Sequence, residues 1–318
     1  MPDARPSAGP RPETEWPTIL LVALTYLVWI LLTRFAEPIG LWIAIPALAV
    51  AIAQHSSLQH EIIHGHPFRN QRLSDALVFP AIGLAVPYER FRALHLAHHR
   101  DPNLTDPYDD PESNYLDPAV WARLPRPVRF LLLANNTLLG RMILGPPIGC
   151  LRHWYEDAAA ILRGDRGIRR AWLLHAAGVA PVLLRLGWAG TVPAWAYGLA
   201  CWLALSLLRI RTFLEHRADE RSAARSVIIE DRGPLALLFL NNNFHAVHHA
   251  RPGLPWYRLP GEYRRQQAMV LRRNGGYRYR SYGEVFRRHL LRRKDPVPHP
   301  LYAAAPEGPP VSRGTAPV

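Results

Sequence analysis

Three clusters of histidine stand out among the residues that could do chemistry in this sequence. The first reads H-E-I-I-H and places two histidines one helical turn apart, and the other two follow the pattern H-x-x-H-H. Fifteen histidines among 318 residues would rarely produce two H-x-x-H-H patterns by chance. Imidazole binds iron, copper, nickel and zinc, so the clusters predict a metal site without choosing the metal. The histidines concerned are His60 and His64, then His95, His98 and His99, then His245, His248 and His249.

The number and spacing of these histidines indicate two metal ions. On a helix His60 and His64 share one face, as do the first two histidines of each H-x-x-H-H pattern. The third histidine of the pattern points about 100° away, so we expect it to bind the other ion. Eight imidazoles exceed the four ligands of a zinc ion, whereas two ions with four or five nitrogens each would use them all.

Taken alone, H-E-x-x-H is also the motif of a zinc protease, with Glu61 as the general base for a metal-bound water. A protease would leave both H-x-x-H-H clusters without a purpose, so this interpretation is disfavoured. Glu61 is then expected to orient an imidazole or to take no part. A non-catalytic membrane protein that holds structural zinc is a further alternative, and the metal content of the purified protein would distinguish it.

The elements that must position the clusters are apolar helices. Four runs are long and apolar enough to approach a bilayer span, and they form two hairpins: residues 18–33 with 39–53, and residues 171–188 with 192–210. A buried soluble hairpin is disfavoured because the first two runs show no polar face. We therefore predict an all-α polytopic membrane protein with four transmembrane helices and a cytoplasmic cap that carries the histidines. Two shorter apolar segments, 76–86 and 130–149, are expected as surface or re-entrant helices.

An even number of spans places both termini and the three clusters on one side of the membrane. That side carries most of the arginines, so the positive-inside rule predicts a multi-pass inner-membrane protein with the clusters and both termini in the cytoplasm. The net charge of +13 suits an anionic membrane surface, and no nucleic-acid-binding motif is present. Residues 1–17 and 295–318 are proline-rich and are expected to be disordered tails around a domain of residues 18–294.

The spacing H-x3-H, H-x2-H-H and H-x2-H-H around four membrane helices resembles the integral-membrane fatty acid desaturase and hydroxylase superfamily. The resemblance covers roughly residues 18–290, and the motifs HLAHHRDPNLTDPYDDPE, RTFLEHR and NNNFHAVHHARPGLPWYRLP carry it. These motifs are more similar to those of bacterial acyl-lipid desaturases than to those of carotenoid ketolases or sterol hydroxylases. His216, in R-T-F-L-E-H, matches a further ligand histidine that the family often has after the fourth helix.

The resemblance implies a non-haem centre of two iron ions that uses dioxygen and two electrons to desaturate an acyl chain. The substrate would be an acyl lipid, an acyl-CoA or an acyl-carrier thioester. The electrons would come from a separate ferredoxin-, rubredoxin- or cytochrome b5-like protein, because neither tail carries a cysteine or a haem motif. Desaturation and hydroxylation share the first hydrogen abstraction, so a lipid hydroxylase of the same superfamily is the alternative.

Polar residues beside the clusters are candidates to accept the second ring N–H of a metal-bound imidazole. For Asp101 and Asp106 an Asx turn in a solvated loop is an equal alternative, and Asp109 and Asp110 are expected to be such loop residues. For the asparagines a helix-cap role is an equal alternative. The candidates are Glu61, Asp101, Asp106, Glu215, Asn241 and Asn242.

Overall fold

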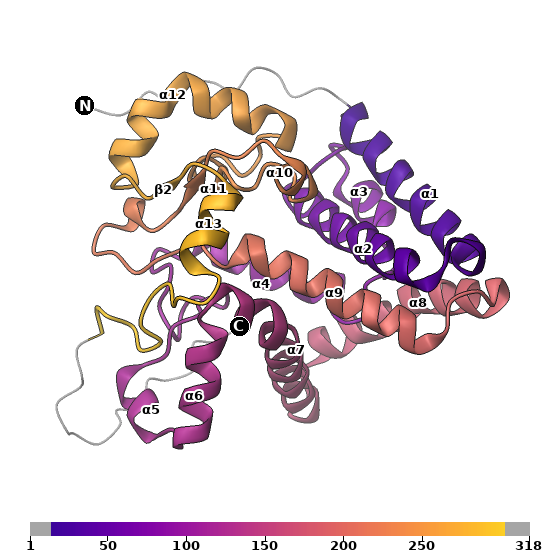
Figure 1. Ribbon diagram of the computed structural model, residues 1–318, viewed down its shortest axis with the longest axis horizontal. Helices are drawn as coiled ribbons and strands as arrows, with labels where there is room; N and C mark the ends of the chain where they lie inside the picture. Colours follow the sequence, from indigo (N-terminus) through magenta and orange to yellow (C-terminus); the bar gives the residue numbers. More distant parts are fainter. Residues whose placement is uncertain (1–13, 303–318) are drawn as a thin grey trace.

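The computed structural model describes residues 14–302, which form a mostly helical protein (Figure 1). The predicted helical fold is confirmed, apart from two short strands that pair in parallel, β1 (Ile228–Ile229) and β2 (Arg278–Tyr279). The helices of the first half are α1 Trp16–Ile39, α2 Leu41–Ile63, α3 Gln71–Leu77, α4 Tyr88–Arg100, α5 Pro118–Arg123, α6 Arg126–Asn135 and α7 Leu138–Leu162. Those that follow are α8 Arg166–Ala189, α9 Ala194–Thr212, η1 Ser222–Ala224, α10 Pro234–Leu238, α11 His245–Ala250, η2 Trp256–Arg258, α12 Leu259–Arg273 and α13 Tyr282–His289.

Three helices of the described chain are long and apolar enough to cross a membrane: α1, α2 and α8. They contain three of the four predicted spans. The fourth predicted span, residues 192–210, forms the 19-residue helix α9. Tryptophans along α9 and the arginines Arg209 and Arg211 in its last turn lower its mean hydropathy. A fourth crossing therefore stays a prediction.

Helix α2 lies between α1 and α9 and packs against both (Figure 1). Both helices, α2 and α9, carry small side chains that are almost completely buried in the same core, Ala49 and Ala53 in α2 and Ala196, Ala200 and Ala204 in α9. Small side chains allow helix backbones to approach closely, which favours helix association in a bilayer where apolar burial gives little driving force. The position of α2 matters for the site because its last turn carries the first histidine cluster.

Helix α1 presents its apolar side chains outward. Four leucines along it are largely exposed, whereas three threonines, Thr18, Thr25 and Thr33, are buried. The hydroxyls of Thr25 and Thr33 donate to carbonyl oxygens one turn earlier, at 2.7 and 2.9 Å. This arrangement suits contact with lipid. Gly40, with a φ of +86°, makes the tight reversal into α2, a conformation that favours glycine. The exposed leucines are Leu20, Leu24, Leu27 and Leu31.

The apolar segment 76–86 is not the predicted helix. Helix α3 ends at Leu77, and the chain then runs as an irregular loop to α4, with Ile82 fully buried. Side chains of α8 and α9 donate to its backbone carbonyls: Tyr197 of α9 donates to Ile82 at 2.7 Å, and His175 of α8 donates to Leu84 at 2.9 Å. Buried irregular backbone needs such donors, and they explain the polar residues inside α8 and α9. Segment 130–149 is helical, within α6 and α7.

Both predicted tails are shorter than expected where the structure describes them. Glu15 is buried with its carboxylate 2.8 Å from Nδ1 of His66, and α1 begins at Trp16. At the other end, residues 295–302 pack on the loop after α4, because Leu116 exchanges backbone hydrogen bonds with Val297 and His299. Proline-rich composition therefore marks these residues as irregular but does not exclude them from the fold. Residues 1–13 and 303–318 lie outside the described residues.

Gly178 of α8 provides a test of this packing. A Cβ atom there would lie 2.5 Å from the carbonyl oxygen of Phe79, a backbone atom that cannot move aside cheaply. We expect Gly178→Ala to lower the free energy of unfolding by about 1–3 kcal/mol, as overpacking does. Gly187→Ala, in the same helix, is the control because a Cβ there meets nothing within 4 Å. Thermal unfolding of both variants in detergent measures the difference, and equal melting temperatures would contradict the close approach of Gly178 to Phe79.

Candidate metal centre

Nine histidines meet in two buried groups. The ring nitrogens of each group lie within 4.8 Å of one another, which is close enough for one metal ion per group. All eight histidines of the three clusters are included, and His216 is the ninth. The first group is His60, His64, His95, His99 and His248; the second group is His98, His216, His245 and His249.

Four short segments bring these histidines together. His60 lies in the last turn of α2 and His64 caps that helix. The second cluster occupies the last two turns of α4, and the third forms most of the six-residue helix α11. His216 follows α9 in an extended stretch that bridges to Ser226. Each segment is short, so the site depends on the packing of α2, α4 and α9 with the residues that follow them.

The division of the H-x-x-H-H histidines between the two groups differs from the prediction. The spacing predicts that the first two histidines of each pattern share an ion. Instead the first and third histidines share a group, His95 with His99 and His245 with His249, and the middle one joins the other group. Residues four apart on a helix differ by only about 40° in direction, against about 60° for residues three apart, so the first and third align better.

The spacing within each group suits metal coordination. The Nε2 atoms of His64 and His95 are 3.0 Å apart, and those of His99 and His248 are 3.1 Å apart. In the second group, Nε2 of His216 lies 3.0 Å from Nε2 of both His98 and His245. Two nitrogens bound at right angles to an ion, each at about 2.0–2.1 Å, are separated by about 3 Å.

Two buried ring nitrogens support the same conclusion. Among the residues that the structure describes, Nε2 of His60 and Nε2 of His249 are buried without a hydrogen-bond partner. Each belongs to a different group and lies among the other ring nitrogens. Buried polar atoms are nearly always satisfied, so an ion in each group accounts for both exceptions. The residues present therefore fit a centre of two metal ions.

The environment keeps most of these imidazoles neutral, as metal ligands must be. Burial lowers the pKa of His99 to about 3, and it holds the pKa values of His216, His245 and His249 well below the usual range. The neighbouring histidines act in the same direction, because a second positive charge nearby is unfavourable. Neutral rings present a lone pair to a metal ion.

His98 is the exception because carboxylates surround it. Burial lowers its pKa, but the hydrogen bond to Asp110 and the charges of Glu112 and Asp110 raise it to about 9. Nδ1 of His98 donates to Asp110 at 2.7 Å, and Nδ1 of His95 lies 2.8 Å from Glu112. A carboxylate on the far nitrogen fixes the orientation of a ligand imidazole and raises its basicity.

For the acids that follow α4, the structure supports the Asx-turn alternative for the two candidates and gives the orienting role to two other acids. Asp110, predicted as a solvated loop residue, is buried against His98, and Glu112 is not among the predicted candidates. Asp101 and Asp106 instead make Asx turns, accepting the backbone N–H groups of Asn103 and of Tyr108 and Asp109. The loop after α4 reverses on these turns, and the reversal returns the later acids toward the histidines. The many acidic residues in DPNLTDPYDDPE indicate a solvated loop, but they do not indicate which of these acids faces the histidines.

Of the candidates near His216 and the third cluster, two contact the histidines and one has another partner. Oδ1 of Asn242 lies 3.2 Å from Nδ1 of His245, and Asn242 donates in turn to Glu215 at 3.0 Å. These two residues therefore position a histidine of the second group, as predicted. Asn241 instead donates to the carbonyl oxygen of Trp256 at 3.1 Å. The hydroxyl of Ser226 lies 3.2 Å from Nδ1 of His216, a contact that sequence reasoning missed.

The carboxylate of Glu61 contacts residues that belong to neither histidine group. Its Oε1 accepts the backbone N–H of Trp256 at 2.9 Å and lies 3.6 Å from Nε2 of His66. Glu61 therefore connects the first cluster to the chain that follows the third cluster. A general base in a zinc protease must instead face the metal-bound water.

We expect Glu61→Gln to keep measurable oxygen-dependent activity, because an amide oxygen can still accept from Trp256. The loss should not exceed about 10–100-fold, whereas removal of a general base costs about 10²–10⁴-fold. Product formation by cells that express each variant, with and without oxygen, measures the effect. Complete loss of activity in correctly folded, metal-loaded Glu61→Gln would contradict the prediction.

A cavity of about 390 Å³ reaches the second group from the surface. Its inner wall includes His216, Glu112 and Glu215, and Phe91 and Leu94 of α4 line one side. The Arg152–Glu156 pair of α7, more than half exposed, also lines it. The cavity therefore provides a route between the surface and the histidines.

The protein combines three helices able to span a membrane with nine histidines in two groups. This combination is typical of membrane-bound metalloenzymes. The comparison with known families agrees: residues 36–281 match the fatty acid desaturase family, and the chain belongs to it. Members of this family are oxygen-dependent oxidoreductases with non-haem iron. The prediction of the family from the three clusters is confirmed, and association with a membrane follows.

Two curated relatives are both described as beta-carotene ketolases. The chain is 26% identical to the one from Paracoccus sp. (strain PC1) over 283 residues, 80% of this chain and 96% of the relative. It is 24% identical to the one from Paracoccus sp. (strain N81106 / MBIC 01143) over 224 residues, 69% of this chain and 74% of the relative. At this identity the relatives support the family but do not establish the reaction.

Proposed function

We propose that this protein is a membrane-bound enzyme with two iron ions that uses dioxygen and two external electrons to desaturate an acyl chain. The observation that supports this proposal best is the division of nine histidines into groups of five and four within a member of the fatty acid desaturase family. A zinc protease needs one ion, and a structural zinc site needs no cavity leading to it.

The residues of the chain have defined tasks in this proposal. The two histidine groups would hold the iron ions, which when bound supply the oxygen chemistry needed to oxidise an unactivated C–H bond. Asp110, Glu112 and Asn242 hold three of the imidazoles in fixed orientations. Burial of the groups excludes water, which protects the reaction from side reactions. The desaturation is R–CH2–CH2–R′ + O2 + 2e⁻ + 2H⁺ → R–CH=CH–R′ + 2H2O.

Oxygen insertion is the second candidate, and the two relatives described as beta-carotene ketolases favour it. It would give R–H + O2 + 2e⁻ + 2H⁺ → R–OH + H2O, and a ketone would need a second such oxidation followed by loss of water. The substrate would then be a carotenoid or another lipid with an activated ring or chain position. The same histidine groups serve both reactions.

Labelling with oxygen-18 gas separates the two candidates. Cells that express the protein, with and without a carotenoid supply, are grown under labelled oxygen, and their lipids are analysed by mass spectrometry. We expect an acyl product that lacks two hydrogen atoms and carries no label. A product with one labelled oxygen would establish oxygen insertion instead, and stoichiometric zinc without iron in the purified protein would contradict both.

The electron donor is proposed to be a separate ferredoxin-, rubredoxin- or cytochrome b5-like protein, and the acyl group to be carried as a lipid, an acyl-CoA or an acyl-carrier thioester. We further propose that the enzyme lies in the inner membrane with the histidine groups on the cytoplasmic side. Arginines at the ends of α4 and α9, such as Arg100, Arg209 and Arg211, support this orientation.

Protease accessibility tests the orientation. With four crossings, we expect a tag inserted after Asn114 to be protected in intact cells and a tag after Gly190 to be cleaved by an external protease. The reason is that Gly190 ends α8, whereas Asn114 lies in the loop beside the histidine groups. Permeabilised cells, in which both tags should be cleaved, are the control. Cleavage at Asn114 in intact cells would show that the orientation is reversed or that one of the predicted crossings is absent.

A further inference from the structure

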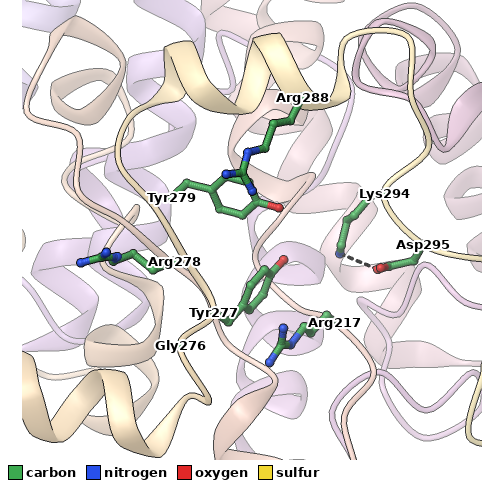
Figure 2. Close-up of a pocket in the computed structure, with 8 residues that line it drawn as sticks. All are labelled: Arg217, Gly276, Tyr277, Arg278, Tyr279, Arg288, Lys294 and Asp295. Atoms are coloured by element: carbon green, nitrogen blue, oxygen red, sulfur yellow. Dashed lines mark ion pairs between the residues drawn. The ribbon is translucent and has the colours of Figure 1, made fainter.

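A second cavity, of about 260 Å³, lies between β2, the chain after His216 and the segment that follows α13 (Figure 2). None of the nine histidines lines it. Four of its eight lining residues are cationic and only one is acidic, which makes it unlike a pocket for a hydrocarbon. The lining residues are Arg217, Gly276, Tyr277, Arg278, Tyr279, Arg288, Lys294 and Asp295.

Each of the four cations that line this pocket has a carboxylate partner, and the surplus of positive charge comes from the arginines that flank the pocket. Lys294 pairs with Asp295 at 3.2 Å, and that carboxylate also accepts from Tyr115. Asp219 lies 3.3 Å from Arg217, Glu230 lies 3.6 Å from Arg278, and Glu284 lies 2.5 Å from Arg288. Around these four pairs the segment 278–295 carries four further arginines, Arg280, Arg287, Arg292 and Arg293, and no further carboxylate. The surplus makes the potential at the pocket positive, which favours an anion.

Two tyrosines hold two of the arginines in place. The guanidinium of Arg217 lies 4.5 Å from the ring centre of Tyr277, and that of Arg288 lies 5.5 Å from the ring centre of Tyr279. Figure 2 shows these four side chains one above another, with Lys294 and Asp295 beside them and Arg278 directed away. Stacked arginines are ordered before a ligand arrives, so less entropy is lost on binding.

We propose that this pocket binds the phosphate group of a ligand. Arginine forks match the oxygen geometry of phosphate and bind it with two parallel hydrogen bonds, and a lysine adds a point charge. The pocket is large enough for a phosphate monoester or a diphosphate but not for a whole lipid. The phosphate could belong to a lipid headgroup or to a soluble phosphate compound, and the chemistry of recognition is the same.

The pocket is connected to the metal centre through the backbone of His216. Arg217 directly follows His216, and Nζ of Lys294 donates a hydrogen bond to the carbonyl oxygen of His216. An anion that draws Lys294 or Arg217 toward itself therefore acts on the chain that carries a histidine of the second group. This proximity distinguishes the pocket from the many arginines elsewhere on the surface.

Isothermal titration of the purified full-length protein tests the proposal. The probes are pyrophosphate and, separately, short-chain phosphatidic acid below its micelle concentration, both at constant ionic strength. We expect saturable binding of at least one probe, weakened about tenfold or more in Arg217→Gln/Arg288→Gln, because two charge-assisted contacts are lost. The control is Arg292→Gln/Arg293→Gln, which removes the same charge from exposed neighbours outside the pocket.

Binding of pyrophosphate alone would identify a soluble phosphate as the ligand, and binding of phosphatidic acid alone would identify a lipid headgroup; both support a phosphate site. If the first double variant does not fold, Arg288→Gln alone replaces it, because this side chain is 56% exposed and its loss should not affect folding. No saturable binding of either probe overturns the proposal. Equal weakening in the control variant also overturns it, since binding would then follow net charge alone. Neither result depends on which oxidation the enzyme performs.

Discussion

His249→Ala is expected to abolish oxygen-dependent turnover and to reduce the iron content from about two ions per chain to about one. Nε2 of His249 is buried without a hydrogen-bond partner among the described residues, and it lies with the other ring nitrogens of the second group. That group has four imidazoles, so the variant leaves three. Elemental analysis of the purified variant and product analysis of the expressing cells measure the two effects.

The first group should respond differently because it has five histidines. We expect His64→Ala to lose activity but to retain most of the metal, since four imidazoles remain. For metal content the matched control is His153→Ala, which changes a histidine of α7 that lines the cavity but belongs to neither group. Full activity in His249→Ala, or equal loss of metal in His153→Ala, would contradict the assignment of the two groups. Alanine at any other of the nine positions should also abolish turnover.

Asp110→Asn is expected to lower the affinity for iron, or the activity, by about 10–100-fold. Oδ1 of Asp110 accepts from Nδ1 of His98 at 2.7 Å, and Oδ2 accepts from the backbone N–H of Thr105 at 2.8 Å. An asparagine has one acceptor in place of two and carries no charge. It can therefore keep only one of these bonds, and it no longer stabilises positive charge on the imidazole.

Asp109→Asn is the matched control for this variant. Asp109 is the preceding residue and is exposed, and its carboxylate accepts a hydrogen bond of 3.3 Å from Asn103. Its substitution should leave metal affinity and activity within about twofold, since isolated surface interactions contribute little. Chelator competition against each purified variant measures the affinity. Equal behaviour of Asp109→Asn and Asp110→Asn would contradict the orientation of the loop after α4.

The sequence alone was sufficient to predict the helical membrane protein, its family and the nine histidines that gather at the site. These inferences rely on local properties: apolar runs, the spacing of histidines along a helix and motifs of a few residues. The first hairpin was found for the same reason, because the apolar length of a span is a property of consecutive residues, whereas a crossing by α9 stays a prediction. The short strands β1 and β2 were missed because each contains two residues and their pairing joins positions 50 residues apart.

Only the tertiary structure decided how the histidines divide and which residues support them. The division of His95 and His99 from His98 depends on how α4 and α11 approach each other, which the spacing within one helix does not specify. The choice of Asp110 and Glu112 over Asp101 and Asp106 depends on a loop that reverses on two Asx turns. The phosphate pocket joins residues 217 and 276–295, which no local pattern connects. Side-chain direction in loops and contacts between distant segments are set by packing of the whole chain, and a single sequence does not reveal them.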